Sequence, residues 1–181
     1  DIVRCVFNEL NEIALQNDGS TYVFAHLLIP HPPFIFGPNG ENITPDHREI
    51  SGLQSWENPQ GYLNQLIYAT SEISVIITNI VENDPNAIII LQGDTGTQTG
   101  IYNPDEEITT KKIYQAHSNL YAVRMPGVND FENAIPVNTY RIIFNNYFDM
   151  NYEYLDQRIY MINDDNTFED ITKTISEYKF D

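Results

Sequence analysis

The feature that most constrains the fold is a long amphipathic segment followed closely by a fully apolar run. Residues 62–82 place apolar side chains at spacings of three and four, which predicts a helix with one buried face. The continuous apolar run over residues 87–91 predicts a strand, and this order is typical of a parallel sheet covered on both faces. The sequence therefore predicts the α/β class, as a three-layer α/β/α domain with a largely parallel sheet. The helical stripe consists of Leu63, Leu66, Ile67, Thr70, Ile73, Ile77, Ile80 and Val81.

The rest of the chain adds elements of both kinds and shows no internal repeat or long linker. Residues 30–61 contain six of the ten prolines and lose all periodicity, which predicts a long ordered loop of the kind that often carries function. We expect residues 1–181 to belong to a single domain. The other predicted elements are a helix over 2–15, strands over 21–29 and 119–125, a helix that begins at Pro136, an edge strand over 158–162 and a last helix over 168–178.

Composition excludes several classes of partner. Nine Lys and Arg residues against 26 Asp and Glu residues give a formal charge of −17, which repels phosphate backbones and anionic lipid headgroups. We therefore expect this segment to contact neither nucleic acid nor a membrane. The single cysteine, Cys5, excludes an internal disulfide and a cysteine-rich zinc site. Because the sequence starts at Asp1 and opens with no signal peptide, we expect it to be a fragment of something longer.

Two predicted strands end in residues that can carry chemistry, and ligands of open α/β sheets bind beyond the carboxyl ends of the strands. The first strand runs into His31, whose flanking prolines fix the backbone and hold the imidazole in a defined direction. The second runs into Asp94, placed where a carboxylate can reach a metal ion. The alternative interpretations are a loop histidine packed against Phe34 and an ordinary aspartate turn before Gly96. Both remain open from these residues alone.

The local charge and the predicted elements around Asp94 limit which ligands and which reactions this turn can serve. No Lys or Arg occurs between Arg48 and Lys111, so an anion site here needs a metal cation, a helix N-terminus or basic groups from elsewhere. The triplet that starts at Asp94 also occurs in aspartic proteases, after an apolar strand. Those enzymes are nearly all-β and pair two such aspartates, whereas here a helix precedes the strand and no second triplet exists.

Three stretches together resemble the sulfatase-like branch of the alkaline phosphatase superfamily. They most resemble the extracellular catalytic domains of membrane-anchored relatives of lipoteichoic acid synthases and phosphoethanolamine transferases. Residues 24–34 are similar to that family's strand ending in His-x-Pro-Phe, and residues 88–96 to its strand ending in Asp-His-Gly. The third stretch is 119–127 with 136–141. The resemblance implies an alkaline phosphatase-like fold and a C-terminal portion of the catalytic domain, extracellular and attached to a membrane-anchored parent.

The family's chemistry is attack by a metal-activated Thr, Ser or formylglycine on a sulfate or phosphate ester. By this resemblance Asp94 is a metal-ligand position for zinc, manganese or calcium, and His31 is a substrate-binding position. Thr95 stands where the family has its second ligand, a histidine, and a hydroxyl is a far weaker ligand for zinc or manganese than imidazole. The nucleophile and first acidic ligand lie upstream in the family, so we expect the upstream half of the parent domain to supply them.

Two hypotheses follow from the resemblance. The chain is either part of a metal-dependent hydrolase or phosphoryl-group transferase that is inactive in isolation, or a degenerate, non-catalytic binding or scaffold module. In both, parallel strands would bring His31 and Asp94 to one edge of a sheet. Because Asp94 next to Thr95 cannot make a complete ligand set, we expect the isolated chain to bind no zinc or manganese more tightly than roughly micromolar.

Overall fold

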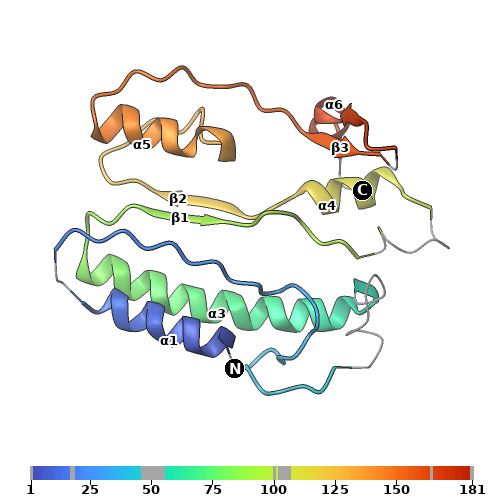
Figure 1. Cartoon of the computed structure of the whole chain (residues 1–181), viewed down its shortest axis with the longest axis horizontal. Helices are drawn as coiled ribbons and strands as arrows, with labels where there is room; N and C mark the ends of the chain where they lie inside the picture. Colours follow the sequence, from blue (N-terminus) through green and yellow to red (C-terminus); the bar gives the residue numbers. More distant parts are fainter. Residues whose placement is uncertain are drawn as a thin grey trace. The chain divides into compact units, whose positions relative to one another are not determined.

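The computed structural model describes residues 2–16, 19–45, 56–99, 101, 107–163 and 165–179. These residues divide into two compact units, the first ending at Ala87 and the second beginning at Ile88. Figure 1 shows the order of the helices and strands along the chain. Over the described residues no helix is long and apolar enough to cross a membrane. Each unit is described separately below.

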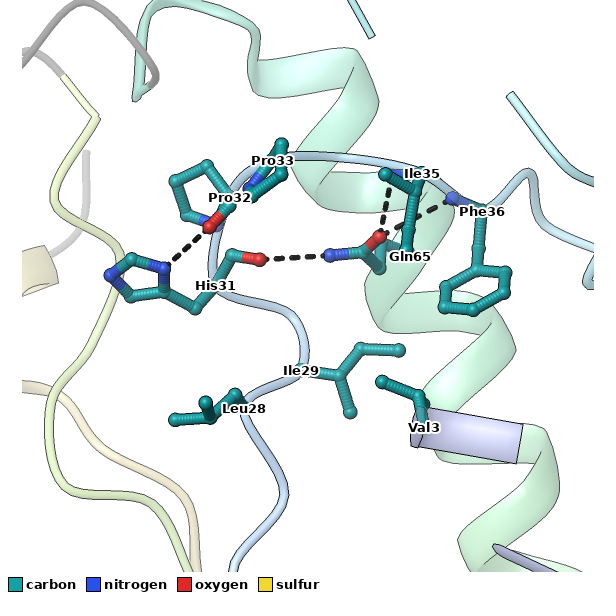
Figure 2. Close-up of a pocket in the computed structure, with 9 residues that line it drawn as sticks. All are labelled: Val3, Leu28, Ile29, His31, Pro32, Pro33, Ile35, Phe36 and Gln65. Carbon is teal, nitrogen blue, oxygen red and sulfur yellow. Dashed lines mark hydrogen bonds between the residues drawn. The ribbon is translucent and has the colours of Figure 1, made fainter. Parts of the chain in front are cut away.

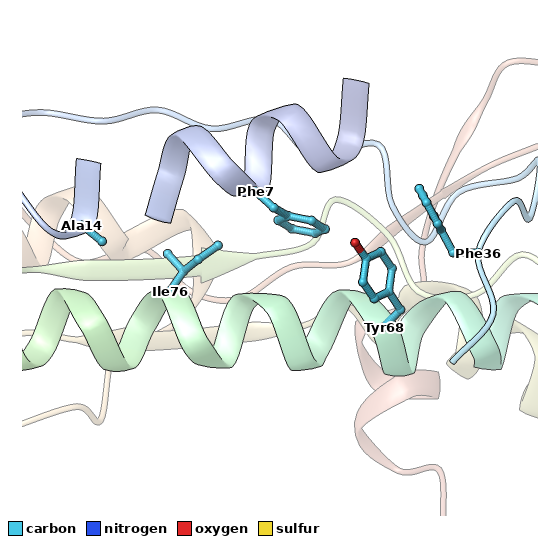
Figure 3. Close-up of a cluster of buried hydrophobic side chains, with 5 residues drawn as sticks. All are labelled: Phe7, Ala14, Phe36, Tyr68 and Ile76. Carbon is cyan, nitrogen blue, oxygen red and sulfur yellow. The ribbon is translucent and has the colours of Figure 1, made fainter. Parts of the chain in front are cut away.

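The first unit is built on two packed helices, α1 (Ile2–Ala14) and α3 (Pro59–Asn83). The carboxamide oxygen of Asn58 accepts the Gly61 N–H at 2.8 Å, and Pro59, which has no N–H, occupies the first turn. Helix α3 therefore begins at Pro59, where fewer backbone N–H groups need a partner. The predicted helices over 2–15 and 62–82 are confirmed. Figure 3 shows the core between them, formed by Phe7, Ala14, Phe36, Tyr68 and Ile76.

The buried face of α3 differs from the predicted stripe. Leu63 and Ile67 belong to that stripe, yet each is 46% exposed. Ile73 and Ile80 do pack against the core. The helix is apolar on more than one side, so periodicity identified the helix without identifying which side packs. The buried positions are Gly61, Gln65, Tyr68, Ala69 and Ile76.

Residues 21–29 have the side-chain pattern of a strand but form no strand in the described structure. Leu27 and Ile29 pack against the core of the first unit, whereas Phe24 and Leu28 are 78% and 70% exposed. No backbone hydrogen bond of these residues occurs within the described part of the chain. The prediction of a strand here is therefore incorrect for the structure as described. A strand needs a second strand that pairs with its backbone N–H and C=O groups, and the local sequence does not specify that second strand.

Among its described residues the second unit contains two short sheets, three α-helices and one 3-10 turn. Strand β1 (Ile89–Gln92) pairs with β2 (Tyr121–Arg124) in antiparallel register, with Leu91 opposite Ala122. The two strands predicted over 87–91 and 119–125 are thus confirmed as strands. Met125, Ile142 and Ile143 form the core beneath this sheet. The second sheet pairs β3 (Tyr160–Ile162) with β4 (Phe168–Asp170), also antiparallel.

The helices of the second unit agree only in part with the sequence pattern. Pro136 opens the short turn η2 (Pro136–Asn138), which leads into α5 (Thr139–Tyr147), as predicted. Helix α4 (Thr110–His117) was not predicted, although Thr109 caps it by accepting the Lys112 N–H. The predicted helix over 168–178 is wrong in its first part, because β4 occupies 168–170 and α6 (Thr172–Ser176) begins only after it. A two-strand pairing with β3 outweighs the weak helical pattern there.

The mixed α and β content of the prediction is confirmed. Both sheets among the described residues are two-stranded and antiparallel, so the three layers and the largely parallel sheet are not seen in them. Local hydrophobicity predicted that residues 87–91 are a strand, but strand direction depends on the partner. The antiparallel partner here, β2, comes later in the sequence beyond α4.

Candidate functional site

His31 lies in a loop that one buried side chain of α3 fixes in place. The carboxamide oxygen of Gln65 accepts the backbone N–H groups of Ile35 at 2.9 Å and Phe36 at 3.3 Å. Its nitrogen donates to the backbone carbonyl of His31 at 3.0 Å. Figure 2 shows this amide set between the two ends of the loop. Gln65 is 2% exposed, so no water replaces these bonds and the loop conformation is tied to α3.

The imidazole of His31 is exposed and held in one orientation. Its Nδ1 lies 2.7 Å from the carbonyl oxygen of Pro32, and because a carbonyl only accepts, Nδ1 carries the proton. In neutral histidine this leaves Nε2 as a free acceptor, while in the imidazolium Nε2 becomes a second donor. The ring meets Trp56 edge-to-face at 5.3 Å between centroids, and Trp56 in turn contacts Phe34 at 6.3 Å. The His31 ring therefore packs against Trp56 and still has its Nε2 available.

The hollow beside this loop is small and apolar. It has a volume of about 190 Å³ and is bordered by Val3, Ile29, Phe36 and Gln65. The polar atoms of Gln65 face the loop backbone, as Figure 2 shows. Ligand pockets usually enclose about 300 Å³ or more, so this hollow does not by itself hold a substrate. Chemistry at His31 would take place on the exposed side of the loop.

Asp94 lies in a well-defined turn directly after β1. The Gly93 N–H donates to the Leu120 carbonyl at 2.8 Å, and the Asn119 side chain donates to the Gly93 carbonyl at 2.9 Å. One carboxylate oxygen of Asp94 accepts the Thr95 N–H at 2.8 Å, and both residues are exposed. A Cβ on Gly96 would lie 1.9 Å from the Gln115 carbonyl oxygen, so only glycine fits this close approach to α4.

The two predicted site residues fall in different units. His31 belongs to the first unit and Asp94 to the second. Their convergence at one sheet edge therefore remains a prediction. Over the residues that the structure describes, no three His, Cys, Asp or Glu side chains are grouped as metal ligands. Asp94 with Thr95 supplies one carboxylate and one hydroxyl, which is short of the three or four ligands that a zinc site uses.

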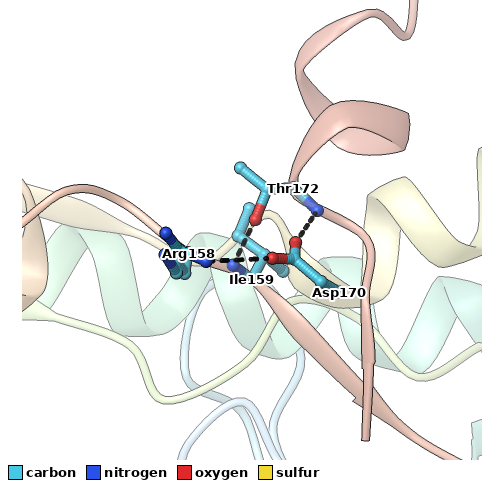
Figure 4. Close-up of polar contacts among 4 residues, drawn as sticks. All are labelled: Arg158, Ile159, Asp170 and Thr172. Atoms are coloured by element: carbon cyan, nitrogen blue, oxygen red, sulfur yellow. Dashed lines mark hydrogen bonds and ion pairs between the residues drawn. The ribbon is translucent and has the colours of Figure 1, made fainter.

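A second polar site, which sequence reasoning missed, lies at the β3–β4 corner. Asp170 accepts the Thr172 N–H at 3.0 Å, and the Thr172 hydroxyl accepts the Ile159 N–H at 2.8 Å (Figure 4). A guanidinium nitrogen of Arg158 lies 3.7 Å from the other oxygen of Asp170. A hollow of about 450 Å³ adjoins Arg158. The size suits a ligand, but the Asp170 carboxylate beside Arg158 weakens the attraction of this corner for an anion.

The acid dependence of this corner is a testable consequence of its hydrogen bonds. The Thr172 hydroxyl, then the Thr172 N–H, and to a smaller extent the charge of Arg158 lower the pKa of Asp170 from 3.8. A lowered carboxyl pKa contributes stability above pH 3.8 that is lost as the pH falls through the folded-state pKa. We expect the carboxyl carbon resonance of Asp170 to titrate below 3.8 and the Thr172 amide signal to move with it. Asp170→Asn should abolish that movement, and a midpoint above the ordinary value would contradict the assignment.

No protein-family model, no curated protein and no solved structure matches this chain. Geometry and chemistry within each unit are therefore what indicate the residues that carry function. On those grounds the His31 loop and the Asp94 turn remain the two candidate positions, each held by side chains that the sequence pattern did not single out.

Proposed function

We propose that this chain is the C-terminal part of a sulfatase-like domain of the alkaline phosphatase superfamily. The whole domain would be a metal-dependent hydrolase of sulfate or phosphate esters, or a phosphoryl-group transferase, on the extracellular side of a membrane-anchored protein. Residues 1–181 alone would be inactive, because the upstream half of the domain supplies the nucleophile and the first acidic metal ligand. Asp94 would be a ligand of the divalent metal and His31 would contact the substrate.

The observation that carries the proposal is the way Gln65 presents His31. This buried amide makes three hydrogen bonds to the loop and so holds the loop in one conformation. The fixed Nδ1–H to Pro32 leaves Nε2 of His31 directed away from its own backbone. In the imidazolium form Nε2–H can donate to an oxygen of a sulfate or phosphate ester, which is the role that the resemblance implies.

The extended segment 21–29 supports the finer fold of this proposal. In the proposed three-layer α/β/α domain it is a strand of the largely parallel sheet. Its last residues alternate, since Leu27 and Ile29 pack against the core while Leu28 between them is 70% exposed. Its backbone groups make no hydrogen bonds within the described residues, and such groups are normally paired once they are buried. A neighbouring strand would satisfy them, and another layer of the domain would cover Phe24 and Leu28.

The second candidate is a degenerate, non-catalytic binding or scaffold module that keeps the fold. A specific observation favours it. Asp94 uses one carboxylate oxygen to cap its own turn at Thr95, and Thr95 occupies the position where the family has a ligand histidine. A metal ion would then have one free carboxylate oxygen and a weak hydroxyl at this position.

Metal content separates the two candidates. We expect a longer protein containing residues 1–181 to retain a divalent metal after dialysis and to hydrolyse a nitrophenyl sulfate or phosphate ester. Asp94→Asn should weaken metal binding at least about tenfold and remove the activity. In the isolated chain, calorimetric titration with zinc and manganese should show no binding tighter than roughly micromolar.

Asp130→Asn is the matched control, because Asp130 also accepts a backbone N–H of its own turn and is exposed. It should leave metal and activity unchanged. For His31, the matched control is His117→Ala, since His117 also uses Nδ1 at a backbone carbonyl, at 2.8 Å from Ile113. His31→Ala should raise KM, whereas His117→Ala should not. A longer protein that holds no metal and hydrolyses neither ester would exclude the enzyme and favour the non-catalytic module.

A further inference from the structure

Helix α5 carries a row of exposed aromatic side chains in the second unit. Tyr140, Phe144 and Phe148 follow one another at intervals of four residues, and Tyr152 joins them from the extended segment after the helix. Neighbouring rings in this row are 5.7 to 6.4 Å apart between centroids. Their exposed fractions are 53%, 39%, 59% and 51%. We call these four residues the α5 aromatic patch; Tyr147, 37% exposed and three residues after Phe144 on the same helix, extends it.

The patch is held rigid before any partner arrives. Asn145 donates to the Tyr152 carbonyl at 2.9 Å and accepts the Tyr152 N–H at 2.7 Å, which fixes Tyr152 beside Phe144. The Phe144 carbonyl accepts two N–H groups, from Phe148 and Met150, so the chain turns back at the end of α5. Because these hydrogen bonds fix the backbone of the segment in the free chain, binding at the patch does not have to order it.

The area of the patch is that of one side of a small interface. An aromatic side chain buries roughly 150–250 Å² when fully covered, and the five residues are about half exposed. Together they offer on the order of 500 Å², at the low end for specific interfaces, in which each partner contributes roughly 800 Å² at standard size. Contiguous apolar patches of this size on protein surfaces are often interaction sites.

We propose that the α5 aromatic patch is the contact surface between two copies of this chain. The row is symmetric about Phe144, so two antiparallel α5 helices would place Phe144 against Phe144 and Tyr140 against Phe148. The same arrangement sets Asp149, just past the helix C-terminus, near the amino-terminal end of the other helix, where the dipole is positive and Arg141 lies. Such a patch is complementary to itself, as a two-fold interface requires.

The net charge of the chain determines how this association responds to salt. Each copy carries a formal charge of −17, so two copies repel each other over distances beyond the interface. Salt screens that repulsion while leaving the burial of aromatic surface intact. The dimer should therefore become tighter as salt increases, the opposite of an association driven by opposite charges.

Sedimentation equilibrium of residues 1–181 at 20 mM and 300 mM sodium chloride tests the proposal. We expect a concentration-dependent dimer that is favoured at the higher salt. Phe144→Glu places two carboxylates against each other at the symmetry axis and should weaken the dimer at least about tenfold. Phe168→Glu is the matched control, because Phe168 is 71% exposed on β4, outside the patch, and should leave the dimer unchanged.

Thermal unfolding should show that the Phe144→Glu and Phe168→Glu variants are both folded. Phe148→Ser repeats the test without adding a charge. A monomer at all concentrations and both salt levels would overturn the proposal. So would equal weakening by the two glutamate variants, or a dimer that dissociates as salt rises. The proposal does not depend on the sulfatase-like function, because it uses only residues of α5 and the segment that follows.

Discussion

Replacing Gln65 with Leu is expected to destabilise the first unit by about 3–5 kcal/mol. The substitution keeps an uncharged side chain of similar size but removes the partners of three backbone groups, the N–H groups of Ile35 and Phe36 and the carbonyl of His31. Each buried group left without a partner costs about 1–3 kcal/mol. Since the three groups lie in one loop, the loop itself should detach from α3 before the helices separate.

Trp56 reports on that loop, because it is the only tryptophan and its ring lies 5.3 Å from the imidazole of His31. Urea unfolding followed by Trp56 fluorescence should show the lower stability of Gln65→Leu. The emission maximum of this variant should be shifted already in the absence of urea. The matched control is Gln60→Leu on the same helix, where an exposed amide donates only to Asn64. The control should change stability by less than about 0.5 kcal/mol. Equal effects of the two substitutions would mean that Gln65 does not hold the loop.

Replacing Asn138 with Leu is expected to cost about 2–4 kcal/mol in the second unit. Asn138 is fully buried, and its amide makes two hydrogen bonds of 2.9 Å to Leu155, donating to the carbonyl and accepting the N–H. The pair fastens the segment after α5 to the start of that helix. Leucine leaves both backbone groups of Leu155 without these partners, at about 1–3 kcal/mol for each.

Amide exchange at Leu155 together with urea unfolding measures this effect. Asn145→Leu is the matched control, since Asn145 makes the same two-way contact with Tyr152 in an exposed position. The groups freed there are hydrated, so the cost should stay near 1 kcal/mol. If the exposed substitution proved as costly as the buried one, burial would not be the reason that Asn138 matters.

The elements that the sequence predicted are those that carry their signal locally. Both long helices of the first unit and the strands β1 and β2 are found where periodicity and apolar runs predicted them. Helix α4 was missed because it is short and only weakly apolar, although Thr109 was a readable capping residue. The start of the last predicted helix was wrong because β4 pairs with β3, and that pairing depends on residues six to ten positions earlier in the chain.

The candidate site likewise has some features that the local sequence indicates and others that it does not. The prolines around His31 and the position of Asp94 after an apolar run were readable, and both lie in ordered turns. The residues that hold those turns were not readable. Gln65 is polar within a helix pattern and Asn119 is polar at a strand end, so each looked like an ordinary surface residue. Their roles depend on which backbone groups the fold brings within hydrogen-bond distance.

By itself the sequence determined the acidic charge, the positions of most helices and strands and the absence of an internal disulfide. These follow from side-chain type and spacing, which act over a few residues. Only the tertiary structure decided that β1 pairs antiparallel with β2, that α3 buries Gln65 while exposing Leu63, and that residues 21–29 form no strand with any other described segment. Each of these depends on contacts between segments far apart in the chain, where burial and hydrogen-bond satisfaction outweigh local preference.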